Sequence, residues 1–312
     1  MEAAMMLPLI DWHPRATLQP LHFAWLQRAG VEVAVLRLDR IDPLISGNKW
    51  FKLTGYLQAA HAAGAHGLIS LGGAHSNHLH ALAAAGKRFG FATVGLLRGH
   101  PQQTPTTLDL ERFGMQLHWL GFAGYRARHA PGFWEPWQER YPLLHNVPEG
   151  GGGLVGAAGC MPLVVQVREQ LSTLGWDDYH GWWLAAGTGT TLAGLILGED
   201  PQRRVYGALA VPDDHGVAAQ VERILLEAGW GPGNHELIDA SRGGFAKVDG
   251  ALLDFIRDSE AASDLPLEPL YTGKALMALK QAVEAGRFTA GQRLVFVHTG
   301  GLQGRRGFEA LL

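Results

Sequence analysis

The chain has 312 residues, of which 47% are apolar and 42 are glycine, a composition typical of a folded α/β protein and not of a disordered or fibrous one. Charged residues make up 18% and the formal net charge is -3, which gives no indication of a nucleic-acid or membrane partner. The single cysteine, Cys160, excludes an internal disulfide framework and favours a cytoplasmic location, and no apolar run reaches the roughly twenty residues of a membrane span.

Apolar periodicity predicts strands and helices that alternate along most of the chain. The expected strands cover 31–38, 67–71, 91–97, 115–120, 181–186, 204–211 and 293–298. The expected helices cover 53–63, 76–89, 106–113, 160–174, a segment ending near 198, 217–228, 249–258 and 275–285. Residues 121–148, which contain Pro, Trp and Arg, are expected to form a loop. Such alternation indicates βαβ units and parallel sheets.

We therefore expect an α/β protein with two open, twisted domains, one on each side of a cleft. The smaller domain is predicted at 53–160, and the larger one combines 1–52 with 161–312. In open α/β sheets, ligands bind beyond the carboxyl ends of the strands, near the following helix N-termini. A boundary near Lys49 would place that lysine in the cleft.

Lys49 follows a small Ser46-Gly47-Asn48 turn just before an amphipathic run. An amine on such a turn can act as a covalent catalyst, because it condenses with an aldehyde. The same residue could also be a solvated lysine at the start of a helix, since exposed lysines are the norm. Spacing alone leaves both interpretations open.

The segment 187–191, Gly-Thr-Gly-Thr-Thr, follows an apolar strand and opens a helix. Its glycines let backbone N–H groups approach an anion, the helix N-terminus adds about half a positive charge, and the hydroxyls can donate further hydrogen bonds. This pattern suits a phosphate monoester. It lacks the Gly-Lys-[Ser/Thr] end of a Walker loop, and Leu192 occupies the third glycine position of a dinucleotide fingerprint. A tight turn without a ligand is the alternative.

A second strand-to-helix loop ends in His75-Ser76-Asn77. Ser76 or Asn77 could simply cap the helix, or could offer a proton-shuttling hydroxyl and an amide donor. His75 and His78 would share a helix face, but no cysteine or carboxylate follows at metal-site spacing, so we expect no metal. Tyr271 is a core tyrosine or a proton donor in the cleft.

Five motifs stand in an order and spacing that resemble a known family. They are Ser46-Gly47-Asn48-Lys49-x-x-Lys52-Leu53, Gly72-Gly73-x-x-Ser76-Asn77, Glu149-Gly150-Gly151, Thr188-Gly189-Thr190-Thr191-x-Ala193-Gly194 and Leu270-Tyr271-Thr272-Gly273-Lys274. From about residue 18 onward, the chain resembles the D-cysteine desulfhydrase and 1-aminocyclopropane-1-carboxylate (ACC) deaminase family. That family has the tryptophan synthase β-subunit fold, fold type II of the pyridoxal-phosphate enzymes.

The resemblance implies that pyridoxal 5'-phosphate is the cofactor and that Lys49 bonds covalently to it, with Lys52 as a supporting charge. Asn77 would hydrogen-bond the 3-oxygen of the ring, and Thr299 would meet the pyridine nitrogen. The cofactor phosphate would rest on Gly187, Thr188, Gly189, Thr190 and Thr191.

The resemblance further implies a deaminating lyase that removes a β leaving group from a small amino acid such as D-cysteine. Ser76 and Tyr271 would be catalytic together with Lys49. The substrate would be contacted by Ser76, Asn77, His75, Phe245, Tyr271 and Thr272. A cytoplasmic homodimer is the family expectation.

Some positions leave the substrate open. Thr272 and Thr299 are similar to the desulfhydrases, whereas ring-opening deaminases carry Glu and Leu there. Phe245 lacks the hydroxyl of a second tyrosine that family members often have, and His75 stands where many have Gln. The alternatives are therefore an ACC deaminase, a lyase for another β-substituted or sulfonated amino acid, a non-catalytic pyridoxal-phosphate-binding protein, and a nucleotide- or sugar-phosphate-binding α/β protein that does not use Lys49.

Overall fold

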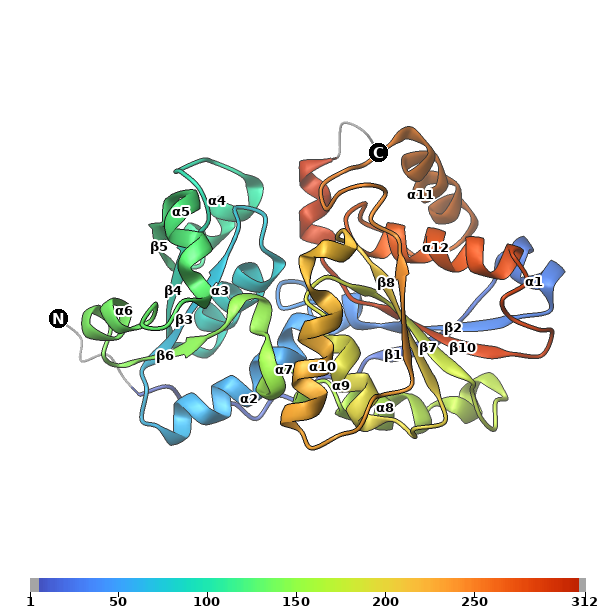
Figure 1. Ribbon diagram of the computed structural model, residues 1–312, viewed down its shortest axis with the longest axis horizontal. Helices are drawn as coiled ribbons and strands as arrows, with labels where there is room; N and C mark the ends of the chain where they lie inside the picture. The colour runs from blue at the N-terminus through green and yellow to red at the C-terminus, as the bar shows by residue number, and fades with distance from the viewer. Residues whose placement is uncertain (1–5, 309–312) are drawn as a thin grey trace.

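The computed structural model describes residues 6–308 and contains two parallel-rich sheets, each covered by helices (Figure 1). The smaller sheet has the strand order β5-β4-β3-β6, and all of its strands are parallel. Its strands are β3 (Gly67–Gly72), β4 (Ala92–Leu97), β5 (Gln116–Trp119) and β6 (Leu144–Val147). Its helices are α2 (Asn48–Ala62), α3 (Asn77–Phe89), α4 (Pro105–Arg112), α5 (Gly121–Arg126) and α6 (Glu135–Arg140).

The larger sheet has the order β1-β2-β10-β7-β8-β9, in which only the edge strand β1 runs antiparallel. Its strands are β1 (Thr17–Leu21), β2 (Glu32–Arg37), β7 (Gly181–Ala186), β8 (Arg204–Leu209), β9 (His235–Asp239) and β10 (Arg293–His298). Its helices are α1 (Ala24–Ala29), α7 (Gly153–Ala158), α8 (Pro162–Arg168), α9 (Thr190–Gly198), α10 (Val217–Glu227), α11 (Gly250–Ala262) and α12 (Thr272–Glu284). The predicted α/β class with mainly parallel sheets is confirmed.

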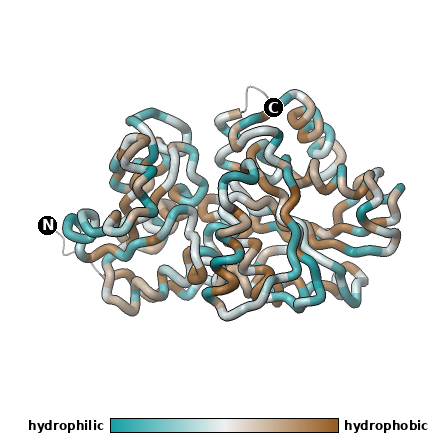
Figure 2. The backbone as a smooth tube through the Cα atoms, in the orientation of Figure 1, coloured by the Kyte–Doolittle hydropathy of each residue, from teal (hydrophilic) through white to brown (hydrophobic). Residues whose placement is uncertain are grey.

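The larger sheet is buried on both faces because helices cover each of them. Successive residues of a strand point to opposite faces, so Trp182 and Leu184 join one apolar core while Trp183 and Phe296 join the other. Figure 2 shows apolar segments inside both halves of the molecule and hydrophilic segments on the outer loops. Within residues 6–308, no helix is both long enough and apolar enough to cross a membrane.

Several predicted element boundaries were wrong. The expected loop at 121–148 contains α5, α6 and the edge strand β6, a strand of only four residues whose two middle residues are His145 and Asn146. The expected helix at 160–174 is broken into α8 and a 3₁₀ turn at 171–174, with Pro162 at the first position of α8. Helix α2 starts at Asn48 and not at 53, so Lys49 lies in its first turn.

Strand membership supports the predicted division of the chain, which we keep as a proposal. All four strands of the smaller sheet come from residues 67–147, and all six strands of the larger sheet come from 17–37 and 181–298. The exact limits, 53–160 for the smaller domain and 1–52 plus 161–312 for the larger, remain predictions.

A buried carboxylate joins β7 to the end of α9. Glu199 is 4% exposed and accepts hydrogen bonds from the Tyr179 hydroxyl, from Trp182 Nε1 at 2.7 Å and from Arg203 Nη1 at 3.1 Å, and it pairs with Arg168. Arg203 also pairs with Asp178 at 2.6 Å, so removal of the carboxylate mainly affects Arg168 and the two buried donors of Tyr179 and Trp182.

We expect Glu199→Ala to lower the free energy of unfolding by about 3–5 kcal/mol, because it leaves Arg168 and two buried donors without their acceptor. Urea denaturation followed by circular dichroism measures this loss. Asp177→Ala, which removes the exposed partner of Arg293, is the matched control and should leave the urea midpoint unchanged. Equal midpoint shifts for the two variants would contradict the assigned role of Glu199.

Candidate active site

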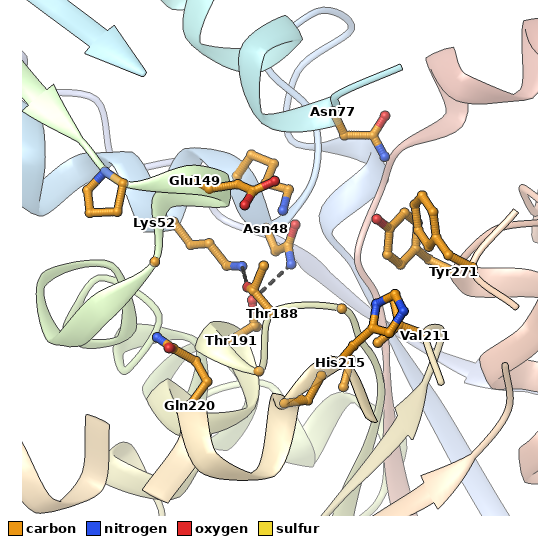
Figure 3. Close-up of a pocket in the computed structure, with 18 of the residues that line it drawn as sticks. Asn48, Lys52, Asn77, Glu149, Thr188, Thr191, Val211, His215, Gln220 and Tyr271 are labelled. Carbon is orange, nitrogen blue, oxygen red and sulfur yellow. Dashed lines mark hydrogen bonds between the residues drawn. The ribbon is translucent and has the colours of Figure 1, made fainter. Parts of the chain in front are cut away.

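A cleft of about 740 Å³ lies where the carboxyl ends of β7 and β10 face the N-termini of α2 and α3 (Figure 3). Both sheets contribute to its walls, as expected for a ligand site between two α/β units. Of the predicted site residues, the cleft is lined by Lys49, Asn77, Gly187, Thr188, Gly189, Thr191, Phe245, Tyr271 and Thr299. His75, Ser76, Thr190 and Thr272 are not among its lining residues.

The N-terminus of α2 is fixed against the end of β10 by a close backbone contact. Gly47 has a φ of 83°, and a Cβ at this position would lie 2.3 Å from the carbonyl oxygen of Thr299. The next residue, Asn48, donates its backbone N–H to that same oxygen at 3.1 Å, and its Nδ2 donates to Thr191 Oγ1 at 2.9 Å. Only glycine fits at position 47, for both its conformation and the space available.

Lys49 is half-buried in the first turn of α2, one helical turn before Lys52. Burial, followed by the charge of Lys52, lowers the pKa of Lys49 well below its usual value. Lys52 is 3% exposed, and burial lowers its pKa as well. The neighbouring His78 is buried, and burial together with the two lysines lowers its pKa well below normal. Three basic groups packed together therefore favour a neutral, nucleophilic amine on Lys49.

The loop after β7 opens α9 and presents hydroxyls together with free helix N–H groups. Thr188 Oγ1 lies 3.0 Å from Thr190 Oγ1, and Lys52 Nζ lies 3.5 Å from Thr188 Oγ1. Tyr271 packs closely on Gly187, so that its ring carbon would lie 3.0 Å from a Cβ at position 187. With a lysine beside it, this helix start is suited to an anion of the size of phosphate.

The loop after β3 divides into a structural and a cleft-facing part. Ser76 caps α3 by accepting the N–H of Leu79 at 3.2 Å, which was one of the two expected roles. Asn77 reaches the cleft, and its Oδ1 accepts from Gln303 Nε2 at 2.9 Å, so its Nδ2 is left to donate. His75 is exposed outside the cleft. The catalytic role of Ser76 and the substrate contact of His75 remain predictions.

Tyr271 lies at the N-terminus of α12 and is held by the buried carboxylate of Glu268. Glu268 accepts the backbone N–H groups of Tyr271 at 2.8 Å and Thr272 at 2.6 Å, and the Thr272 hydroxyl at 3.1 Å. Thr272 is fully buried, so its hydroxyl faces Glu268 and not the cleft. Burial, followed by the charges of Glu268 and Glu149, raises the pKa of Tyr271, which therefore keeps its proton.

Sequence reasoning did not identify Tyr125 and Arg128, which hold the only carboxylate among the cleft-lining residues that the structure describes. Glu149 accepts from the Tyr125 hydroxyl at 2.5 Å and from Arg128 Nε at 2.6 Å. The lining includes six lysine and arginine side chains. Such an excess of cations attracts anionic ligands. The Glu149-Gly150-Gly151 motif was the available signal, but it did not indicate the partners of the glutamate.

Thr299 lies at the end of β10, where its side chain lines the cleft and its carbonyl oxygen is engaged by Asn48. Phe245, on the loop after β9, also lines the cleft and is 38% exposed. Among residues 6–308, no group of three or more histidine, cysteine, aspartate or glutamate side chains could hold a metal ion.

No family model matches the chain. A relative from Pyrococcus horikoshii, a putative 1-aminocyclopropane-1-carboxylate deaminase, is 28% identical, and the match covers 88% of this chain and 86% of the relative. The bifunctional D-cysteine desulfhydrase/1-aminocyclopropane-1-carboxylate deaminase of Arabidopsis thaliana is 26% identical, over 88% of this chain and 73% of the relative.

A solved structure described as an ACC deaminase homologue superimposes with a TM-score of 0.83 at 26% identity, covering 98% of this chain and 95% of the other. These similarities in sequence and structure confirm the resemblance to the D-cysteine desulfhydrase and ACC deaminase family that the five motifs predicted.

Proposed function

We propose that the protein is a pyridoxal-phosphate-dependent lyase that catalyses α,β-elimination on a small amino acid similar to D-cysteine. The products would be pyruvate, ammonia and sulfide, with the uptake of one water. One observation carries this proposal: the amine of Lys49 lines the same cleft as the loop at 187–191, which is suited to an anion, and its pKa is lowered. The names of the relatives support the same reaction class.

The residues of the cleft fit pyridoxal phosphate. The start of α9 and Lys52 would hold the phosphate, because they combine N–H donors, hydroxyls and a cation. Asn77 Nδ2 would donate to the ring oxygen, and the Thr299 hydroxyl would meet the ring nitrogen. Apart from Lys49, the lining has one lysine and four arginines against one carboxylate, which fits a phosphate and an amino-acid carboxylate together. When bound, the cofactor supplies an electron sink that stabilises negative charge at Cα of the amino acid.

Lys49 would act at the Cα proton of the amino acid, and Tyr271 would act at the departing sulfur. A neutral Lys49 amine can remove the Cα proton, because its lowered pKa leaves it a free electron pair near neutral pH. The Tyr271 phenol keeps its proton and can donate a hydrogen bond to the departing sulfur as negative charge develops there. Elimination then breaks the Cβ–S bond, the electron pair leaves with sulfur, and hydrolysis releases ammonia and pyruvate.

The threonine at the expected ring-nitrogen position is relevant to the outcome. A hydroxyl cannot stabilise a protonated ring nitrogen as a carboxylate does, so the electron sink would be weaker. A weaker sink favours prompt loss of the β leaving group over a long-lived carbanion that could racemise. Thr299 therefore supports elimination within the proposed class.

ACC deamination is the second candidate, favoured by the name of the Pyrococcus relative and by the absence of a hydroxyl on Phe245. A panel of D- and L-amino acids that includes ACC, scored by 2-oxo-acid release, separates the two. We expect D-cysteine to give the highest kcat/KM. Release of 2-oxobutyrate from ACC, with no reaction of D-cysteine, would replace the main proposal by the alternative.

We further propose that the protein is a homodimer, which rests on the family expectation. We also propose that it is cytoplasmic, because its single cysteine, Cys160, is free and buried. Light scattering after size exclusion measures the oligomeric state, and a mass of one chain, near 33.7 kDa, would contradict the dimer.

The first functional prediction concerns Lys49. The purified protein should be yellow and should release pyruvate, ammonia and sulfide from D-cysteine, whereas Lys49→Ala should lose the visible band and at least about a thousandfold in kcat. Absorbance spectra and product assays measure both properties. Lys87→Ala, on the outer side of α3, is the matched control. A Lys49→Ala protein that keeps both the band and the activity would sink the assignment.

The second prediction concerns pH. Because the charge of Lys52 lowers the pKa of Lys49, Lys52→Met should raise that pKa and leave less neutral amine at neutral pH. The rate at which apoprotein develops its visible band with pyridoxal phosphate should therefore fall at neutral pH and recover at higher pH. Stopped-flow absorbance from pH 6 to pH 10 tests this. A profile that is scaled down without a shift would mean that Lys52 acts only on the phosphate.

A further inference from the structure

Lys274 belongs to the Leu270-Tyr271-Thr272-Gly273-Lys274 motif, yet neither the cofactor site nor the proton transfers use it. Its side chain is 1% exposed, and its ammonium does not line the cleft. Nζ instead donates to three backbone carbonyl oxygens of one loop, those of Ser241 at 2.9 Å and of Gly244 and Phe245 at 3.0 Å each. All three N–H donors of the ammonium are thereby used.

The loop that Lys274 holds, residues 241–247, is otherwise tied to the rest of the protein at its start, where Ser241 bonds to Asp239 and Arg242 pairs with Asp249. Arg242 has a φ of 56°, the only positive φ of a non-glycine residue among residues 6–308, and Gly243 follows with 80°. The N–H groups of Gly243, Gly244 and Lys247 bond within the loop at 3.2–3.3 Å, and only its first residue, Ser241, donates its N–H outward, to Asp239 at 2.8 Å, among the hydrogen bonds of residues 6–308. A left-handed conformation at a non-glycine residue persists only where the surroundings hold it.

The same loop carries Phe245 to the cleft. The Phe245 ring lies 5.6 Å from the ring of Tyr271, in an edge-to-face arrangement with an interplanar angle of 62°. Tyr271 and Lys274 are three residues apart at the start of α12, so they lie on neighbouring positions of one helix face. The start of α12 therefore presents Tyr271 to the cleft and, through Lys274, anchors the loop that carries Phe245 beside it.

We propose that Lys274 is a positioning residue that holds the 241–247 loop so that Phe245 forms a wall of the substrate pocket beside Tyr271. Through this wall Lys274 would determine how well the site fits the side chain of its amino-acid substrate. The substrate part of this inference rests on the proposed lyase function, whereas the loop-holding part does not.

The number of donors makes this arrangement sensitive to pH. Burial lowers the pKa of Lys274 to about 8. Four charged groups surround it: Glu268 before α12, Asp239 at the end of β9, and the ion pair of Arg242 and Asp249. The three carboxylates raise the pKa of Lys274, and the arginine lowers it. A neutral amine has two N–H donors, so one carbonyl of the loop loses its partner as the pH rises through 8.

Two measurements on the holoenzyme test the proposal. The first is trypsin cleavage after Arg242 and Lys247, which lie within the loop and report its release without any need for activity. The second is the steady-state kinetics of D-cysteine elimination. The variants are Lys274→Met, Phe245→Ala and the double variant. Lys280→Met is the matched control, because Lys280 lies on the same helix and pairs only with Glu284.

We expect Lys274→Met to be cleaved after Arg242 and Lys247 roughly tenfold faster than wild type, and to raise KM roughly tenfold while kcat changes less than about threefold. Phe245→Ala should raise KM similarly, and the double variant should be no worse than either single one, because both act through the same wall. Lys280→Met should behave as wild type. Unchanged cleavage in Lys274→Met, or KM effects that multiply in the double variant, would overturn the proposal.

If Lys274→Met does not fold, the wild-type enzyme still decides the matter. Its cleavage after Arg242 and Lys247, normalised to a small peptide substrate of trypsin, should rise between pH 7 and pH 9, and a flat ratio would refute the loop-holding role. If no amino acid is turned over, the lyase function fails while the cleavage data still test the loop.

Discussion

The cleft depends on the contact between Gly47 and the end of β10, where two backbones approach more closely than any side chain permits. A Cβ on Gly47 would lie 2.3 Å from the Thr299 oxygen, and one on Gly300 would lie 2.5 Å from the Gly47 Cα. Helix α2 begins at this contact, while its later residues Trp50, Leu53 and Leu57 pack in the core of the smaller unit. A single helix therefore starts at the larger sheet and is buried in the smaller one, and Lys49 and Lys52 lie at the junction.

The placement of these lysines has an electrostatic consequence. Burial beside a second cation disfavours the ammonium form, so the arrangement that brings Lys49 to the anion loop also lowers its pKa. Glu268 has a comparable role on the opposite wall. Its buried carboxylate caps the start of α12, orients Tyr271 and helps to keep the phenol protonated. The shifted pKa values of Lys49 and Tyr271 therefore arise from burial and from neighbouring charges.

Regular apolar periodicity was sufficient to predict the central strands and most helices, since β3, β4, β7 and β10 are mainly apolar runs and a glycine-rich loop follows β3, β7 and β10. The edge strands β1, β6 and β9 were missed. They are short, and residues such as His145 and His235 interrupt their apolar pattern, so pairing with a neighbouring strand and not local propensity makes them strands. The break in the predicted helix at 160–174 was missed because Val and Leu continue at helical spacing across it.

The sequence by itself determined which motifs exist and that the loops at 72–77, 187–191 and 299–301 follow strands, whose carboxyl ends are where ligands bind in open α/β sheets. The resemblance of its motifs to a known family predicted that Lys49, Asn77, Tyr271 and Thr299 belong to one site. Only the tertiary structure decided which side chains face the cleft. Ser76 and Asn77 are adjacent, yet the first caps α3 and the second reaches the cleft, while Thr272 turns to Glu268. Asn77 is oriented by Gln303, a partner 226 residues away along the chain that no local pattern specifies. Ser76 and Thr272 have partners close by in sequence, but Thr272 and Glu268 are both buried, and only the packing of the chain decides that burial.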